Sequence, residues 1–138
     1  MTQSIEHSIC DYQKMLDNVW NSLDIEIIEN LFVDLINAWH SRSNVFLCGN
    51  GGSSANANHL ANDLIYGINP LGKGLNAHSL CANTAINLCL ANDIGYESIF
   101  SNQLSTLGKK GDILIVLSGS GNSANIVKAL NEARKIGL

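Results

Sequence analysis

Two short apolar runs, each followed by a glycine- and serine-rich segment, constrain the fold of this chain more than any other feature. Residues 45–48 form one run and lead into residues 49–54, while residues 112–117 form the other and lead into residues 118–123. A helical pattern follows each segment. Apolar runs this short are typical of strands that are buried on both faces, and strands that alternate with helices form parallel sheets. The sequence therefore predicts an α/β fold.

The rest of the chain fits a flavodoxin-like parallel sheet with helices on both faces. Right-handed crossovers place every strand-to-helix loop at one edge of such a sheet, which is where ligands bind in open α/β folds. The periodicity predicts one more strand over residues 75–80, and helices over residues 5–23, 24–39, 55–65, 83–90, 99–107 and 124–136.

The first 43 residues predict a helical arm, separate from the domain formed by residues 44–138. Apolar residues recur at spacings of three and four along both helices of the arm. These stripes either cover their own domain or pack against the same helices of a second chain. A homo-oligomer would also protect the open edges of a sheet with three clear strands. The stripe residues are Ile5, Ile9, Tyr12, Leu16, Val19 and Leu23, then Ile28, Leu31, Phe32, Leu35, Ile36 and Trp39.

Composition excludes several classes of protein. Twelve acidic against eight basic side chains in 138 residues give a net charge of −4, and the Lys and Arg residues form no cluster, which argues against a nucleic-acid partner. Charged residues interrupt the N-terminus, so neither a signal peptide nor a membrane partner is expected. The four cysteines form no C-x-x-C pair. They indicate reduced, mostly buried thiols in a cytoplasmic protein.

The two glycine- and serine-rich segments suit an anion. The first N–H groups of a helix have no partner within the helix, and the helix dipole favours negative charge there. Serine hydroxyls add donors, and neutral donors can hold a phosphate by converging on it. The candidate phosphate-binding residues are Ser118, Ser120 and Ser123, with Gly51, Gly52 and Gly119 letting the backbone approach the ligand.

The two segments also resemble each other in sequence. Ser54-Ala55-Asn56 and Ser123-Ala124-Asn125 each begin two residues after the last glycine of their segment. Two loops of one type, each between a strand and a helix, argue more strongly for a ligand site than one such loop does. Neither reads as a nucleotide site. The first lacks the G-x-G-x-x-G pattern with an acidic residue after the next strand, and neither ends in the G-K-[ST] of a P-loop. No nucleotide cofactor is expected.

At these residues the chain resembles the SIS-domain family and, within it, the phosphoheptose isomerase group. Residues 48–53 match the first loop of the group, residues 91–96 match its G-N-D-x-G-[FY] turn, and residues 111–125 match its G-D-V-L-L-x-I-S-x-S-G-N-S-x-N stretch. The resemblance covers almost the whole chain, including the helical arm.

The resemblance implies an isomerase that converts sedoheptulose 7-phosphate to D-glycero-D-manno-heptose 7-phosphate through an enediol, for lipopolysaccharide or capsule sugars. It implies a homotetramer with sites shared between chains. The phosphate binders that the resemblance implies are Ser118, Ser120 and Ser123. Asn50 and Ser53 would contact the sugar, and Asp93 would lie near its reacting end.

The group's general base is a glutamate four residues past a histidine. Here the pair is His59 and Asp63, which share one helix face. Some members bind zinc with this pair, so Zn²⁺ is a candidate cofactor. Aspartate retracts the carboxylate by about 1.5 Å, enough to disturb the short contact that a base requires. From the residues alone, Asp63 is either the base or a solvated carboxylate, and His59 either a ligand or acid or a structural histidine.

The group also has a C-terminal strand, helix and tail that supply a second acid/base histidine and a glutamine. This sequence stops at Leu138, before that region, and so resembles a truncated member. Three functions fit: an isomerase, a non-catalytic SIS protein, or an inactive fragment. A bacterial relative of the second kind binds the replication initiator protein and lacks the catalytic glutamate.

Overall fold

A computed structural model describes residues 4–138 of the chain, which form two compact units. One unit ends at Val33 and the other spans Asp34–Leu138. The division falls within a helix, α2 (Ile25–Ser41). The second unit includes the later part of α2 because Leu35, Ala38 and Trp39 pack into its core.

The first unit contains α1 (Ile5–Asn21) and the beginning of α2, as the periodicity predicts. The Ser4 hydroxyl caps α1 by accepting the His7 amide at 3.2 Å. The Asp24 carboxylate caps α2 by accepting the amides of Glu26 and Ile27 at 3.1 and 3.3 Å. Helix α1 has no buried residue, so its apolar stripe is uncovered within this unit.

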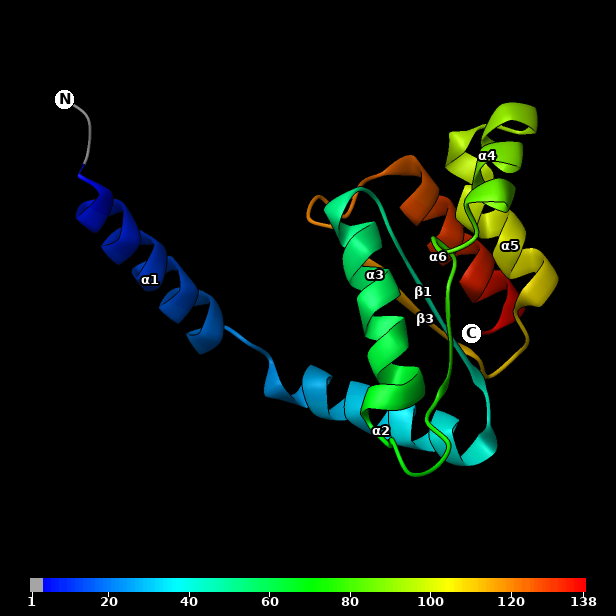
Figure 1. Ribbon diagram of the computed structural model, residues 1–138, viewed down its shortest axis with the longest axis horizontal. Helices are drawn as coiled ribbons and strands as arrows, with labels where there is room; N and C mark the ends of the chain where they lie inside the picture. Colours follow the sequence, from blue (N-terminus) through cyan, green and yellow to red (C-terminus); the bar gives the residue numbers. More distant parts are fainter. Residues whose placement is uncertain (1–3) are drawn as a thin grey trace. The chain divides into compact units, whose positions relative to one another are not determined.

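The second unit is built on a parallel sheet (Figure 1). Its strands are β1 (Asn44–Gly49), β2 (Asn76–Ser79) and β3 (Ile113–Leu117), in the order β2-β1-β3. Val45 lies opposite Ala77 on one side and Ile113 on the other, with both pairings parallel. All three predicted strands are therefore present and adjacent.

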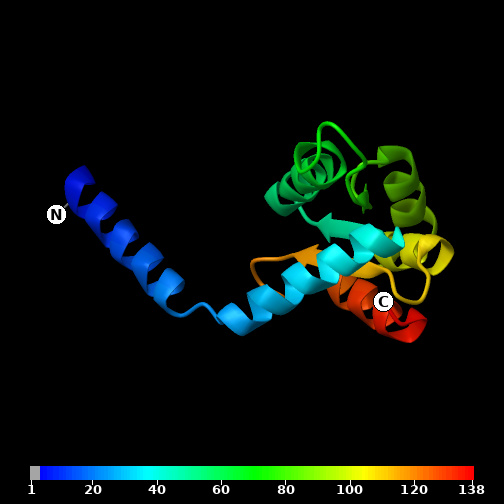
Figure 2. The same ribbon diagram turned by 90° about the horizontal axis from the view of Figure 1, so that it is seen from below.

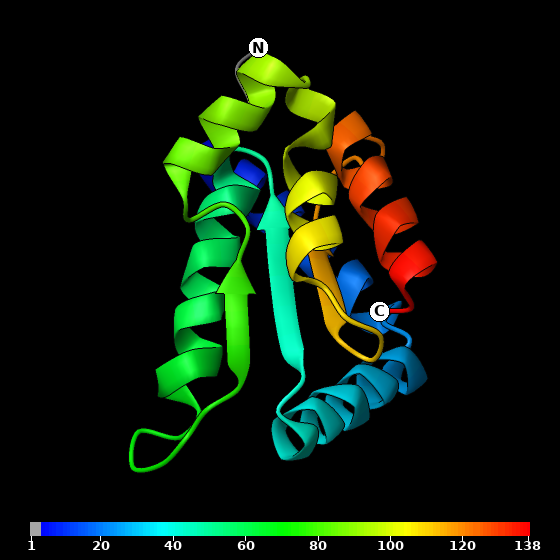
Figure 3. The same cartoon turned by 90° about the vertical axis from the view of Figure 1, so that its right-hand side faces the viewer.

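Helices cover both faces of this sheet, because β1 is apolar on both sides. Phe46 and Cys48 face the core beneath α4 (Thr84–Asp93), α5 (Ile99–Leu107) and α6 (Ala124–Ile136). Val45 and Leu47 face α3 (Gly52–Asn62) and the end of α2. Figures 2 and 3 show α3 and α6 on opposite sides of the strands. The predicted α/β architecture is confirmed. A 3₁₀ turn, η2 (Tyr96–Ser98), precedes α5.

Polar side chains tie together the amino ends of the three strands. The buried Asp112 carboxylate accepts the backbone and side-chain N–H groups of Asn44 at 2.8 and 2.9 Å, and the Lys109 amide at 2.9 Å. The Asn76 side chain donates to the Asn44 side-chain oxygen. This chain of hydrogen bonds helps to hold the register at one end of the sheet and leaves the carboxyl end to the loops.

One element differs from the prediction. The helix expected over residues 55–65 changes at Asp63 into a π turn, η1 (Asp63–Gly67), in which the Ile68 amide donates to the Asp63 carbonyl at 2.9 Å. The Leu64 carbonyl in this turn accepts the Leu75 amide at 2.8 Å. The wider turn coincides with the return of the chain towards β2, a long-range contact that periodicity does not encode.

The cysteines are less buried than predicted. Cys48 is buried and Cys81 partly so, but Cys10 and Cys89 are exposed because their helices turn those positions to solvent. No helix within residues 4–138 combines the length and hydrophobicity needed to cross a membrane.

Candidate functional site

The two glycine–serine loops begin side by side at the carboxyl ends of β1 and β3. Gly49 and Leu117, the last residues of the two strands, lie opposite each other in the parallel register. A Cβ atom added to Gly49 would lie 2.8 Å from the Leu117 carbonyl oxygen and 2.7 Å from the Ser53 Cβ atom. A side chain at residue 49 would therefore separate the two loops. The expectation that they lie together is confirmed.

A pair of asparagines joins the loops directly. The Asn50 amide nitrogen donates to the Asn125 side-chain oxygen at 2.9 Å, and the Asn125 nitrogen returns a hydrogen bond to the Asn50 oxygen at 2.8 Å. The Tyr96 hydroxyl donates to the same Asn50 oxygen at 2.8 Å. Asn50 follows β1, Asn125 lies in the first turn of α6, and Tyr96 begins the turn before α5, so three loops meet here.

Two serines of the second loop accept hydrogen bonds from the backbone of the same loop. The Ser118 hydroxyl oxygen accepts the Gly121 amide at 3.1 Å, and the Ser120 oxygen accepts the Asn122 amide at 3.3 Å. Each hydroxyl keeps its own hydrogen, which can be donated to a ligand. Ser123 is the N-cap of α6, and its side chain makes no capping bond. Gly119 is exposed, like Ser120.

The first loop presents backbone rather than hydroxyls. Gly51 is the N-cap of α3 with a φ of 54°, a left-handed value that favours glycine. Gly52 begins the helix and is exposed, while Ser53 is partly buried and donates its amide to the Asn50 carbonyl at 3.0 Å. The candidate sugar-binding residues Asn50, Gly51, Gly52 and Ser53 thus surround one helix start.

The sequence match between Ser54-Ala55-Asn56 and Ser123-Ala124-Asn125 does not correspond to a structural match, because the two segments stand at different positions relative to the starts of their helices. Ser123 precedes α6 as its N-cap, whereas Ser54 is already the third residue of α3. The position equivalent to Asn125, the second residue of its helix, is Ser53 rather than Asn56. Sequence similarity misplaced the match because α3 begins on glycines, which the periodicity did not count as helical.

His59 and Asp63 form the predicted pair on one helix face. The His59 Nε2 and Asp63 Oδ2 atoms are 3.5 Å apart, and the side chains are 79% and 48% exposed. His59 is therefore not a buried structural histidine. Asp63 comes eleven residues after Gly52, which places it roughly 16 Å further along the helix axis. Within one chain, the first loop precedes α3 and Asp63 directly follows its last residue, so the two lie at opposite ends of this helix, which Figure 1 labels.

Asp93 ends α4 and is exposed. Its carboxylate accepts the Asn92 side-chain N–H at 2.7 Å and the Cys89 thiol at 3.5 Å. The turn reaches the first loop through Tyr96 instead. The sequence reasoning did not identify Tyr96 or Asn125 as site residues, although both end the motifs that carry the family resemblance.

A small hollow of about 150 Å³ lies behind the first loop. Its polar wall includes Asn87, whose side-chain N–H donates to the Leu80 carbonyl at 3.1 Å and whose oxygen accepts the buried Gln103 amide at 2.9 Å. The Cys81 thiol donates to the Gly49 carbonyl at 3.3 Å. The lining is Gly49, Asn50, Gly51, Ser54, Cys81, Asn87, Tyr96, Ile99 and Phe100.

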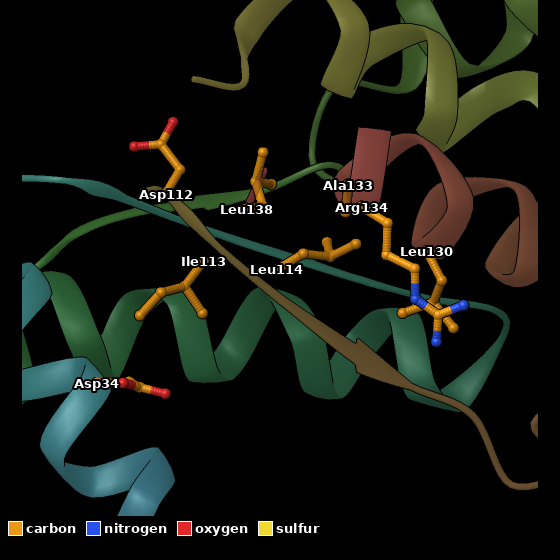
Figure 4. A pocket seen from close by; sticks show the side chains of 8 residues that line it. All are labelled: Asp34, Asp112, Ile113, Leu114, Leu130, Ala133, Arg134 and Leu138. Atoms are coloured by element: carbon orange, nitrogen blue, oxygen red, sulfur yellow. The ribbon is translucent and has the colours of Figure 1, made fainter. Parts of the chain in front are cut away.

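A larger hollow of about 270 Å³ lies beside β3, an edge strand of the sheet (Figure 4). Asp112 and Ile113 line it from the start of β3, and Leu138 from the end of the chain. The loop over residues 118–123 follows the other end of that strand, beside the end of β1 and its loop. This hollow therefore lies apart from the candidate site.

The two loops can attract an anion only through neutral N–H and O–H donors, because neither contains Lys or Arg. Burial, with a smaller effect of Cys81, raises the pKa of the Cys48 thiol to about 12. Cys48 therefore stays protonated at neutral pH and is not a nucleophile. Farther from the loops, the pKa of Glu97 is lowered by a hydrogen bond from its own backbone and by Lys128, whose Nζ atom lies 3.3 Å from Oε1.

Among residues 4–138, the side chains that lie together do not make up a complete set of zinc ligands. No group of three or more His, Cys, Asp or Glu side chains in this range could hold a metal ion. His59 and Asp63 supply two donors, whereas catalytic zinc sites use three protein ligands. The predicted zinc ligands therefore do not amount to a site within one chain, and the chemistry proposed below uses no metal.

The chain matches known proteins along nearly its whole length. Residues 11–138 match the SIS domain family model. The chain is 36% identical over 137 residues to the phosphoheptose isomerase of a Nitratiruptor species, covering 99% of this chain and 73% of that protein. It is 41% identical over 115 residues to the phosphoheptose isomerase of Akkermansia muciniphila, covering 83% of this chain but only 59% of that protein.

Two solved structures have the same fold. The phosphoheptose isomerase of Neisseria gonorrhoeae superposes with a TM-score of 0.83 at 27% identity, covering 97% of this chain and 70% of that one. The phosphoheptose isomerase of Francisella tularensis gives a TM-score of 0.86 at 27% identity, with coverage of 97% and 72%.

Proposed function

The chain belongs to the SIS-domain family and, within it, to the phosphoheptose isomerases, and from this membership we propose that it binds sedoheptulose 7-phosphate and isomerises it. The product is D-glycero-D-manno-heptose 7-phosphate, and the setting is cytoplasmic synthesis of lipopolysaccharide or capsule heptose. The observation that carries the proposal is the adjacency of the two loops at the ends of β1 and β3.

The second loop is the proposed phosphate site. Ser118 and Ser120 already accept backbone N–H groups, so their own hydrogens are directed to other acceptors. Ser123 adds a hydroxyl and the start of α6 adds unpaired amides. With Gly119 between them, these groups can surround a phosphate without a basic residue.

The reaction moves a proton between two neighbouring carbons of the sugar. A base removes the proton from the carbon beside the ketose carbonyl while an acid protonates the carbonyl oxygen, which gives the enediol. The base then returns a proton to the former carbonyl carbon, and the hydroxyl on the neighbouring carbon gives up its proton to become the aldehyde oxygen. We assign the base to Asp63 and the paired acid or orienting role to His59, 3.5 Å away. Asp93 is assigned to the reacting end of the sugar.

Within one chain, the proposed base Asp63 lies at the other end of α3 from the first loop. This separation supports a site that is shared between two copies of the chain. A second copy can bring its Asp63 to the sugar held by the loops of the first. The arm offers a surface for such an assembly, because the stripe residues Ile9, Tyr12 and Val19 are 55%, 63% and 56% exposed. Uncovered apolar stripes of this kind mark interaction sites. We therefore propose a homo-oligomer, tetrameric as in the group, formed through the arm.

The direct test follows the conversion of sedoheptulose 7-phosphate by the purified chain. We expect isomer formation, its loss in Asp63→Ala, and a gain in Asp63→Glu, which extends the carboxylate by about 1.5 Å. Binding without turnover in every variant would favour a non-catalytic SIS protein. Absence of binding by a well-folded chain would exclude the proposed function.

Mixing variants tests whether the site is shared. Asp63→Ala lacks the base, and the Ser118→Ala, Ser120→Ala double variant lacks two phosphate donors. If the groups come from different copies, dissociating and reassociating a mixture restores part of the activity, because some interfaces combine one intact half from each chain. No recovery in an oligomer shown by sedimentation to contain both variants would contradict the shared site.

A further inference from the structure

The hydrogen-bonding capacity of Asn50 is almost fully used inside the protein. An asparagine side chain has two acceptor lone pairs on its oxygen and two hydrogens on its nitrogen. The Asn50 oxygen accepts from Asn125 and from Tyr96, both at 2.8 Å, which uses both lone pairs. The nitrogen donates one hydrogen to Asn125 at 2.9 Å. One N–H therefore remains, and no acceptor.

Asn125 is the partner that enforces this arrangement. Its side chain is 2% exposed, and both its nitrogen and its oxygen are bonded to Asn50. A buried amide that pairs reciprocally resists rotation, because rotating it would place two oxygens and two nitrogens face to face. Tyr96 donates its hydroxyl to the Asn50 oxygen at 2.8 Å and so favours the same orientation.

We propose that Asn125, together with Tyr96, is a positioning residue that fixes the Asn50 amide so that it offers the bound sugar one N–H and no oxygen. This inference rests on the proposed function, because it takes the ligand to be a ketose phosphate. The group bound by Asn50 is then an oxygen acceptor. The ketose carbonyl is such a group, and a fixed N–H donor also stabilises the negative charge that this oxygen acquires as the enediol forms.

The same contacts join the first loop, which is proposed to bind the sugar, to the start of the helix after the second loop, which is proposed to bind the phosphate. Asn125 lies two residues after Ser123, at the start of the helix that receives the phosphate. Loss of the Asn125 orientation should therefore affect recognition of the sugar portion more than recognition of the phosphate. This difference separates a positioning role from general support of the fold, which would weaken both.

The test compares the affinities of the full chain for inorganic phosphate and for sedoheptulose 7-phosphate. We expect wild type to bind the sugar phosphate more tightly. Tyr96→Phe removes one donor from the Asn50 oxygen at an exposed position, so the variant should fold. It should lose roughly two- to tenfold of the sugar-phosphate affinity while keeping phosphate affinity within about twofold. Asn125→Asp should lose more, because a carboxylate oxygen then faces the Asn50 oxygen and the reciprocal pair that fixes the amide is lost.

Asn56→Ala is the matched control, because Asn56 is the sequence counterpart of Asn125 but is exposed on α3. It should change neither affinity. Equal losses of both affinities in Tyr96→Phe, or no loss in either Tyr96→Phe or Asn125→Asp, would overturn the positioning role.

A spectroscopic readout separates this inference from the proposed function. In the pair, the side-chain N–H hydrogens of Asn50 should have well-separated NMR signals, and the bonded hydrogen should exchange slowly with solvent. Tyr96→Phe should speed that exchange. If wild type binds neither probe, the proposed function fails, and the fixed orientation is judged by this signal alone. Unchanged exchange in Tyr96→Phe would overturn it.

Discussion

The loop over residues 49–54 and the loop over residues 118–123 both join a parallel strand to a helix, but different interactions shape them. In the first, Gly49 is in close contact with Leu117 and Ser53, so packing sets the path of the backbone. In the second, a Cβ atom added at Gly119 would meet nothing within 4 Å, and the hydroxyls of Ser118 and Ser120 hold the turn.

This difference fits the two roles proposed for segments that look alike in sequence, which are phosphate binding for the second loop and sugar binding for the first. The second loop is open and rich in hydroxyl donors, as a phosphate site requires. The first is tied to its neighbours through Asn50, whose side chain keeps a single free N–H. In the proposed site, the serine hydroxyls of the second loop keep their hydrogens for a ligand, whereas the Asn50 side chain of the first is already held by hydrogen bonds within the protein.

The largest expected effect contrasts the glycines of the two loops. Gly49→Ala should lower the free energy of unfolding by about 2–3 kcal/mol, because the new methyl group would overlap the Leu117 carbonyl. Gly119→Ala should change it by under about 0.5 kcal/mol, because that space is open. Urea denaturation of both variants measures the difference. Equal stability of the two would mean that the loops are not packed differently.

An intermediate effect concerns phosphate binding. Ser120→Ala should weaken binding of inorganic phosphate by roughly tenfold or more, because a hydrogen bond to a charged group is lost. Ser53→Ala, in the first loop, should leave phosphate affinity nearly unchanged and weaken only the sugar phosphate. Calorimetric titration with both ligands checks the assignment. A larger phosphate defect in Ser53→Ala would reverse the roles of the loops.

The smallest expected effect is on stability at the start of α6. Ser123→Ala should cost under about 0.5 kcal/mol, because the Ser123 side chain makes no capping bond, although phosphate binding should weaken. Asn83→Ala is the reference, since the Asn83 side chain caps α4 by accepting the Ile86 amide at 3.2 Å, and should cost about 1 kcal/mol. Thermal unfolding compares them. A larger loss at Ser123 would show that its hydroxyl serves the helix rather than a ligand.

The sequence predicted the elements well because their signals are local. The apolar run at residues 45–48 and the glycine after Ile136 mark a strand and a helix end without reference to the rest of the chain. The spacing of His59 and Asp63 likewise placed them on one helix face. The different helix positions of Ser54 and Ser123 were missed, because a helix that starts on glycine gives no periodic signal there. The π turn at Asp63 was missed as well, because long-range backbone contacts leave no such signal.

Alternation of strands and helices was enough to determine the parallel sheet and the edge at which its loops gather, since side-chain periodicity and the handedness of crossovers are properties of the chain itself. Only the tertiary structure decided that Asn50, Asn125 and Tyr96 meet, and that Asp63 lies at the other end of α3. The physical reason is that hydrogen bonds between side chains distant in sequence, Asn50 and Asn125 being 75 residues apart, depend on how the layers pack.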